Sequence, residues 1–317
     1  MDLQKDIEKA AKLIRQGKVV AFPTETVYGL GANALNPVAV ARIFELKERP
    51  SFDPLIIHVA HKTDISKLIN VEDERIWKLT NHFWPGPLTL VLPKSEAVPG
   101  IVTSGLKTVG LRMPDNEIAL RMIKMAGCPV AAPSANKFGK LSPTKASHVK
   151  KQLQGVDFIL DGGATTVGIE STIITLHNEG FEILRHGVIT QQEIQEVIPY
   201  LVKNKKKITH TLAPGMLKSH YSPSVPIYIA GEKMPEIKDV SQAALLSFSG
   251  ENTQGYKYVK IMAPDGDMKT YAAELFSILH ELEDLNVDFI VAEPVPENGI
   301  GIAIMDKLRK AAYRYKK

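Results

Sequence analysis

The sequence predicts an α/β (α+β) fold with two domains, and three observations support this. Extended apolar segments alternate irregularly with helical patterns over residues 1–203, which favours a twisted mixed sheet with flanking helices over a strict βαβ repeat. A segment with little periodicity follows, and a shorter alternation of strands and helices comes after it. The chain has 317 residues, of which 44% are hydrophobic, and this is enough for two cores.

The first domain is expected to begin with an amphipathic helix, because apolar residues recur at helical spacing from Leu3 to Ile14 and end before Gly17. Asn36 and Pro37 match an N-cap followed by proline at the first helical position, and they predict a second helix. Further helices are expected near residues 72–83, 116–126, 145–153 and 190–201. Strands are expected at residues 18–22, 54–59, 87–93, 109–114, 129–133, 158–163, 171–176 and 181–186.

A second, smaller α/β domain is expected near the C-terminus. Residues 203–226 are rich in lysine, proline and glycine, and they predict an interdomain linker. Beyond it, short strands are expected at residues 226–230, 243–248, 256–263 and 288–294, with helices at 270–285 and 302–313. We therefore place the domains at residues 1–203 and 227–317, with residues 204–226 as the linker.

Composition excludes several classes of protein. No apolar run approaches the roughly 20 residues of a membrane span, and the N-terminal segment lacks the apolar centre of a signal peptide, so we expect a cytoplasmic protein. The single cysteine, Cys128, forbids an intrachain disulfide and a thiolate zinc site. A formal charge of +4 neither requires nor excludes nucleic acid, and the basic run at residues 203–207 is typical of a solvated linker.

Known nucleotide-binding and acyltransferase motifs are present only in part. The GLGANA segment at residues 29–34 has the glycine spacing of a dinucleotide fingerprint, but six residues separate it from the preceding strand. No GxxxxGK[ST] phosphate loop occurs. SAN at 134–136 and SPTK at 142–145 resemble serine acyltransferase motifs, but in reversed order and with no KTG after them. Ser142 is instead expected to cap a helix with Pro143 at its first position, where it can also meet a phosphate.

Four cationic side chains border apolar strands or turns rich in proline and glycine: Lys47, Arg49, Arg112 and Arg185. Each alone is typical of a solvated or structural ion pair. Together they predict a cationic cleft, since guanidinium groups suit the oxygens of a polyanion or of an amino-acid carboxylate. His58 is by default a core histidine, although a neutral imidazole near its ordinary pKa can also donate to a substrate oxygen.

A hydroxyl and an amide follow another expected strand end. The apolar segment at residues 129–132 stops at Pro133, and Ser134 and Asn136 come directly after it. We expect these two side chains to offer hydrogen bonds to phosphate or acyl oxygens of a substrate in the cleft.

A family resemblance rests on segments that occur in this order: PTETVYGLGANA, KERPSFDPLIIHV, WPGPLTLVL, TVGLRMP, AAPSANKFGKLSPT, DGG, GIESTII and LRHG. Together they resemble the YrdC family over about residues 1–200, with its paired signatures K-x-R and S-x-N. The segment APGMLKSHYSP and the α/β tail are similar to the long, two-domain members, which are L-threonylcarbamoyl-AMP synthases. The resemblance implies a YrdC-like twisted mixed sheet and a Rossmann-like C-terminal domain.

This resemblance implies a nucleotidyltransferase that converts ATP, L-threonine and bicarbonate into threonylcarbamoyl-adenylate and pyrophosphate. Around L-threonine it places Thr26, His58, Arg112, the backbone at Ala132, and Ser171. Around ATP it places Arg49, Asp53, Thr108, Ser134, Ser142, Arg185 and Tyr221, the last folding back from the linker as a lid. The phosphate end and the catalytic set are Lys47, Arg49, Ser134 and Asn136.

Its implied cofactor is Mg²⁺ bound with ATP, and the sequence identifies no protein ligand for the metal. The product would feed threonylcarbamoyl modification of adenosine 37 in tRNA and would pass to a tRNA threonylcarbamoyl transferase complex. We expect weak or no direct tRNA binding and no membrane.

Two other functions stay open at this point. A module that binds double-stranded RNA would use a concave basic face without chemistry. A carbamoyltransferase that uses carbamoyl phosphate is known among YrdC-like domains, although those proteins carry cysteine-rich zinc modules that Cys128 alone cannot form.

Overall fold

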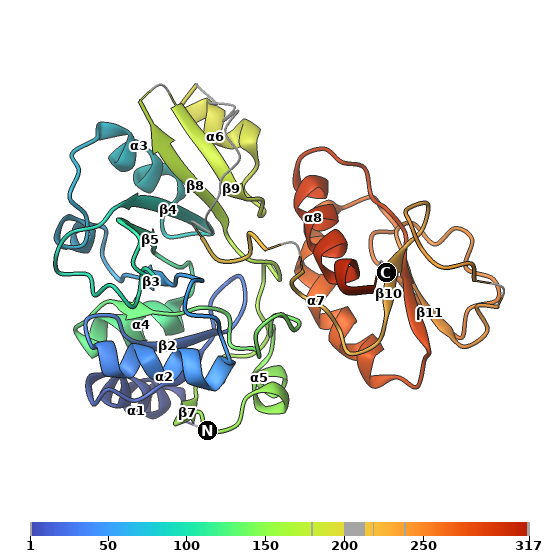
Figure 1. Ribbon diagram of the computed structural model, residues 1–317, viewed down its shortest axis with the longest axis horizontal. Helices are drawn as coiled ribbons and strands as arrows, with labels where there is room; N and C mark the ends of the chain where they lie inside the picture. Colours follow the sequence, from blue (N-terminus) through green and yellow to red (C-terminus); the bar gives the residue numbers. More distant parts are fainter. Residues whose placement is uncertain (1, 179, 200–212, 218, 238, 316–317) are drawn as a thin grey trace.

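The structure, a computed structural model, describes residues 2–178, 180–199, 213–217, 219–237 and 239–315. Figure 1 shows two domains, a blue-to-yellow domain with the first sheet and an orange-to-red domain with the second. Each domain combines helices and strands, which confirms the predicted α/β (α+β) class with a mixed sheet and a second α/β domain. The boundaries at 203/204 and 226/227 stay predictions, and both the first boundary and the basic run at 203–207 lie outside the described residues.

The first domain contains a nine-stranded sheet in the order β7-β1-β2-β6-β3-β5-β4-β8-β9. Three neighbouring pairs are parallel (β1 with β7, β3 with β5, β4 with β8) and the others are antiparallel. The strands are β1 (Val20–Phe22), β2 (Gly29–Asn33), β3 (Ile56–His58), β4 (Leu88–Pro93), β5 (Thr108–Arg112), β6 (Val130–Ala131), β7 (Phe158–Ile159), β8 (Thr172–His177) and β9 (Gly180–Arg185).

Of the helices in this domain, α2 (Pro37–Lys47) begins at its predicted cap. The helix bounds are α1 (Leu3–Arg15), α2 (Pro37–Lys47), η1 (Lys62–Lys67), α3 (Glu74–Phe83), α4 (Glu117–Ala126), α5 (Ala146–Gln152) and α6 (Gln191–Val197). The Asn36 side chain accepts hydrogen bonds from two backbone N–H groups at the start of α2, as its position before a proline predicts. That helix ends at Glu48 with a left-handed backbone (φ 53°), and the chain then turns toward Arg49. The K-x-R signature therefore spans a helix end.

The predicted cap at Ser142 is wrong. Helix α5 begins at Ala146, and its N-cap is Lys145, whose side chain makes no capping hydrogen bond. The Ser142 hydroxyl instead donates to the carboxylate of Glu170 and is fully buried. The Ser142 hydroxyl therefore bonds to a residue 28 positions away and not to the backbone of the helix that follows it.

The second domain contains a four-stranded parallel sheet in the order β10-β13-β11-β12. Its elements are β10 (Ile227–Ile229), β11 (Ala243–Ser247), β12 (Tyr258–Ile261), α7 (Met268–Asp284), β13 (Phe289–Ala292), α8 (Ile300–Ala312) and η2 (Tyr313–Tyr315). In Figure 1, α7 and α8 lie on the side that faces the first domain. There His280 lies within hydrogen-bonding distance of the Ser142 carbonyl, and Lys307 donates to the His186 carbonyl.

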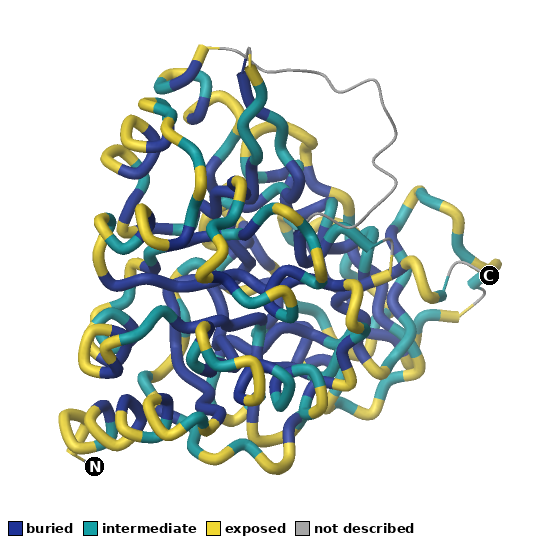
Figure 2. Tube along the Cα trace, turned by 60° about the vertical axis from the view of Figure 1, so that its left-hand side comes forward, coloured by how far each residue is buried: buried dark blue, intermediate teal, exposed yellow. Residues whose placement is uncertain are grey.

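Apolar packing joins the two domains. The buried cluster of the second domain includes Tyr221 of the linker and Val27 and Leu141 of the first domain. Figure 2 shows the buried trace running through the interior and the exposed positions on its outside. Within the described ranges, no helix has the length and apolar character that crossing a membrane requires.

Candidate functional site

The site lies where several strands of the large sheet begin or end. β3 and β5 are parallel, so their last residues, His58 and Arg112, are direct neighbours. The Ala132 N–H, just after β6, donates to the Ile56 carbonyl over 2.9 Å. Ser134 follows and forms an isolated bridge with Gly29 at the start of β2. Sheet pairing thus brings together residues that are far apart in the sequence.

One pocket contains most of the side chains that the sequence singled out. Its lining includes Thr26, Arg49, His58, Arg112, Ala132, Ser134, Arg185 and Tyr221. Its free volume is about 40 Å³, which is room for little more than a few water molecules. Five other predicted site residues are buried but do not line the pocket: Lys47, Asp53, Asn136, Ser142 and Ser171. Thr108 does not line it either.

Lys47 ties the two family signatures together. Its ammonium donates to the carbonyl oxygens of Ser134 and Asn136, both at 2.5 Å, and the residue is 1% exposed. Burial first, and then the charge of Arg49, lowers the pKa of Lys47 well below its ordinary value. The K-x-R and S-x-N segments therefore form one unit through this side chain.

Arg49 is held by an ion pair at the back of the pocket. Its guanidinium lies 2.9 Å from the Asp53 carboxylate and also donates to the carbonyl oxygens of Asp53 and Pro54. Asp53 is 0% exposed, so it orients Arg49 and does not itself line the pocket. Burial raises the pKa of Asp53 and lowers that of Arg49, in each case against the effect of the partner's charge.

Arg112 is fixed on three sides. It pairs with Glu25 at 2.6 Å, donates to the Thr26 hydroxyl at 2.9 Å, and donates to the Gly86 carbonyl at 3.3 Å. A guanidinium held in this way presents its remaining face in a set orientation, as recognition of a carboxylate requires.

Arg185 connects the sheet to the linker. Two of its nitrogens donate to the carbonyl and the hydroxyl of Ser171, both at 3.0 Å, and a third donates to the Pro214 carbonyl at 3.2 Å. The Ser171 hydroxyl is also 2.8 Å from the Thr89 hydroxyl. Arg185 therefore holds Ser171 on one side and the linker residue Pro214 on the other.

His58 is neutral at physiological pH, as predicted, but its pKa is not near the ordinary value that the sequence analysis assumed. Burial, and then the charge of Arg112, lowers its pKa to about 3. Its Nδ1 atom is buried and has no hydrogen-bond partner among the described residues. A neutral imidazole with one unused nitrogen can hold a substrate oxygen or N–H without adding charge.

Asn136 and Thr108 differ from their expected positions. The side-chain NH₂ of Asn136 donates to the carbonyls of Lys137 and Lys140, at 2.8 and 2.9 Å, so it holds a turn and does not offer a donor to a phosphate. Its buried Oδ1 atom has no partner among the described residues. Thr108 is outside the pocket, since it begins β5 and lies about 13 Å along that strand from Arg112.

The described part of the linker closes the pocket. Tyr221 is 0% exposed and packs against Phe276 of α7, with the Lys307 ammonium 5.8 Å from its ring centre. Burial and the nearby Glu170 carboxylate raise its pKa well above the ordinary value, so the hydroxyl keeps its proton. Gly215 has φ 79°, and a Cβ there would lie 2.8 Å from the Tyr221 hydroxyl, so this position requires glycine.

Family models match both domains. A model of the Sua5, YciO and YrdC proteins, described as telomere recombination, matches residues 12–187. A model described as the C-terminal domain of threonylcarbamoyl-AMP synthase matches residues 189–313. The chain belongs to the Sua5/YrdC family. The resemblance seen in the motifs is confirmed, as is the prediction of an enzyme of this nucleotidyltransferase family.

Individual members of the Sua5/YrdC family are similar over almost the whole chain. The threonylcarbamoyl-AMP synthase of Pyrococcus abyssi is 43% identical over 318 residues, which are 96% of this chain and 94% of that protein. The Bacillus subtilis protein of the same name is 43% identical over 321 residues, covering 96% and 92%. The crystal structure of P. abyssi Sua5 complexed with L-threonine has a TM-score of 0.90 at 40% identity and covers 100% of this chain and 96% of that one.

Two carboxylates of the site were missed by the sequence analysis. Glu25 lies beside Arg112, and Glu170 lines the pocket next to Ser142. Both lie inside segments that carry the Sua5/YrdC resemblance, PTETVYG and GIEST, which was the available signal. The cationic pattern that predicts a polyanion site does not include acidic residues. His220 of the linker was missed as well, and it also lines the pocket.

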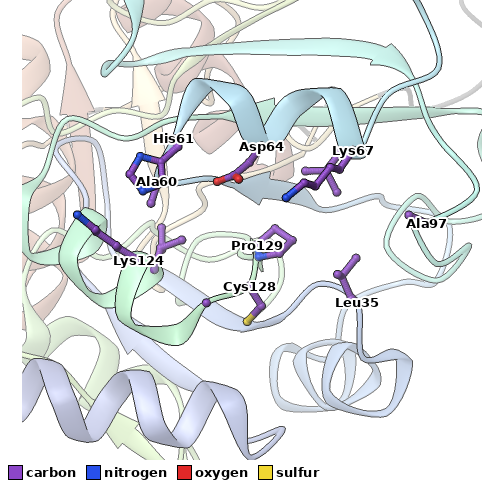
Figure 3. A pocket seen from close by; sticks show the side chains of 12 residues that line it. Leu35, Ala60, His61, Asp64, Lys67, Ala97, Lys124, Cys128 and Pro129 are labelled. Atoms are coloured by element: carbon purple, nitrogen blue, oxygen red, sulfur yellow. The ribbon is translucent and has the colours of Figure 1, made fainter.

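A larger pocket, of about 400 Å³, lies elsewhere in the Sua5/YrdC domain. Figure 3 shows it between η1, which carries Asp64 and Lys67, and the turn with Cys128 and Pro129. Its lining is largely apolar and contains none of the predicted site residues. This pocket offers more room than the pocket with the arginines, but the convergence of buried charges favours the smaller one as the functional site.

Proposed function

We propose that the chain makes threonylcarbamoyl-AMP and pyrophosphate from L-threonine, bicarbonate and ATP. The observation that carries this proposal is the presence of Arg112, Arg49 and Arg185 in the wall of one buried pocket. Arg112 suits the carboxylate of threonine, and the other two, with Lys47 behind them, suit the phosphates of ATP. The names of the relatives and the L-threonine in the P. abyssi structure support the same substrates.

The proposed reaction has two bond-forming steps. The ammonium of threonine loses a proton, and its nitrogen bonds to the bicarbonate carbon with loss of water to give a carbamate. A carbamate oxygen then attacks the α-phosphorus of ATP, and pyrophosphate leaves. Ordering of three reactants can lower such a barrier by about 7–11 kcal/mol, and each preorganised donor adds a few kcal/mol more. In this proposal Lys47, Arg49 and Arg185 stabilise charge on the phosphates.

The linker acts as a lid in this proposal. A free volume of about 40 Å³ is far below the roughly 300–1,000 Å³ of ordinary ligand pockets, so Tyr221 and the Pro214 carbonyl must move before the substrates enter. When Pro214 leaves Arg185, that guanidinium gains a free donor for a phosphate oxygen. Closure afterwards would exclude water from a labile acyl-adenylate.

Downstream, we propose that the product serves threonylcarbamoylation of adenosine 37 in tRNAs that read ANN codons, in the cytoplasm, by hand-off to a transferase complex. Binding of double-stranded RNA by the four cations is disfavoured, because their exposures are 1% for Lys47, 7% for Arg49, 4% for Arg112 and 5% for Arg185. Contacts with a phosphate backbone need exposed cations.

The test is pyrophosphate release from ATP with bicarbonate and each amino acid in turn, without RNA. Threonine is expected to support release, and valine, its isostere without the hydroxyl, to be disfavoured by about 10⁴-fold if the site hydrogen-bonds that hydroxyl. A parallel reaction with carbamoyl phosphate in place of bicarbonate and threonine tests the carbamoyltransferase alternative. Pyrophosphate release that ignores the amino acid supplied would contradict the proposal.

A further inference from the structure

Glu170 is an unusual residue for a site that binds a polyanion. It is 5% exposed, it lines the pocket, and its Oε1 atom accepts the hydrogen bond from the Ser142 hydroxyl. Its Oε2 atom is buried and makes no hydrogen bond of normal geometry with the described residues, although the Tyr221 hydroxyl lies beside the carboxylate. Of the buried carboxylates in the described site, Asp53 pairs with Arg49 and Glu25 pairs with Arg112, while Glu170 has no ion pair.

This carboxylate would repel the nucleotide if the two met directly. Two like charges 4 Å apart repel by about 4 kcal/mol at the effective dielectric of a partly buried site. The ammonium groups near Glu170 offer limited compensation, because both are already engaged. Lys47 donates to two backbone carbonyls, and Lys307 donates to the His186 carbonyl and to the Asp306 carboxylate. A divalent cation between the carboxylate and the phosphates would turn this repulsion into attraction.

We propose that Glu170 and Ser142 are the protein ligands of the Mg²⁺ that accompanies ATP, an assignment that rests on the proposed function. Mg²⁺ prefers hard oxygen ligands and is commonly bound by one or two carboxylates with phosphates and water. A hydroxyl beside a carboxylate is the donor set of other phosphoryl-transfer sites. The described residues include no group of three or more acidic, histidine or cysteine side chains suited to a metal, so phosphate and water supply the other ligands.

Glu170→Gln separates the metal role from a structural one. The glutamine oxygen can still accept the hydrogen bond from Ser142, so the packing is kept while the charge is lost. We would measure binding of a non-hydrolysable ATP analogue by calorimetry at a series of Mg²⁺ concentrations, without threonine, so that no turnover occurs. The Mg²⁺ concentration for half-maximal enhancement of binding is expected to rise about 10-fold or more in Glu170→Gln. Affinity for the analogue without Mg²⁺ should be unchanged or higher.

Glu293→Gln is the matched control, because Glu293 also accepts a hydrogen bond from a serine hydroxyl, that of Ser247, but lies in the second domain and does not line the pocket. Its Mg²⁺ dependence should equal that of the unmodified protein. An unchanged Mg²⁺ dependence in Glu170→Gln would overturn the assignment, and loss of turnover in that case would point to proton transfer by Glu170. If the unmodified protein binds no analogue at any Mg²⁺ concentration, the proposed function fails and this assignment with it.

Discussion

Asp53→Ala is expected to lower the free energy of unfolding of the first domain by about 3–5 kcal/mol, because it leaves a buried guanidinium without its counter-charge. Arg49 is 7% exposed and Asp53 is 0% exposed, so water cannot replace the lost carboxylate. The carbonyls of Asp53 and Pro54 would keep two hydrogen bonds to Arg49 but provide no negative charge. Removal of one partner is therefore strongly destabilising. The intact pair nevertheless adds little to the free energy of unfolding, because both charges lose their hydration on folding.

Urea unfolding followed by tryptophan fluorescence measures this effect in the first domain, since the chain's two tryptophans, Trp77 and Trp84, both lie there. Glu117→Ala is the control: it removes an exposed partner of Arg121, also four residues away, and should cost less than about 1 kcal/mol. A similar cost for both variants would show that burial of the first pair is irrelevant.

Lys47→Met is expected to lower threonine-dependent pyrophosphate release by about 10²–10³-fold, the usual effect of removing one preorganised donor from a transition-state site. Methionine can occupy most of the space of the lysine stem, but it cannot donate to the carbonyls of Ser134 and Asn136. The S-x-N segment then loses its connection to α2, and the phosphates lose a nearby positive charge. Both effects act on the reacting end of ATP in the proposed function.

Initial rates at saturating ATP and threonine measure this loss. Lys137→Met serves as the control, because Lys137 is one residue from Asn136 but its side chain is 38% exposed and pairs with Glu48 at the surface. Lys137→Met should retain nearly full activity. If the two variants had equal rates, Lys47 would have no special role in the reaction.

The fold and the cations of the site could be predicted because their signals are local. The Asn36-Pro37 cap and the apolar spacing of α1 each lie within a few residues of the helix that they define. Arg112 and Arg185 are the last residues of apolar strands, and ligands of α/β sheets commonly bind outside the carboxyl ends of strands. The order of the family segments along the chain then identified the fold to which these strands and helices belong.

The errors came from partners that are distant in sequence. Ser142 precedes a proline and looks like a cap, yet its hydroxyl bonds to Glu170, 28 residues away. His58 looked like an ordinary imidazole, but sheet register places Arg112 beside it and burial lowers its pKa to about 3. No local pattern gives the register of a nine-stranded mixed sheet, so these pairings could not be deduced from the chain alone.

The most direct test of the shared pocket is a crystal structure with both L-threonine and a non-hydrolysable ATP analogue. We expect the threonine carboxylate on Arg112 and the phosphates beside Lys47, Arg49 and Arg185, with Tyr221 over the nucleotide. Either ligand bound instead in the 400 Å³ pocket beside Cys128 would contradict the account.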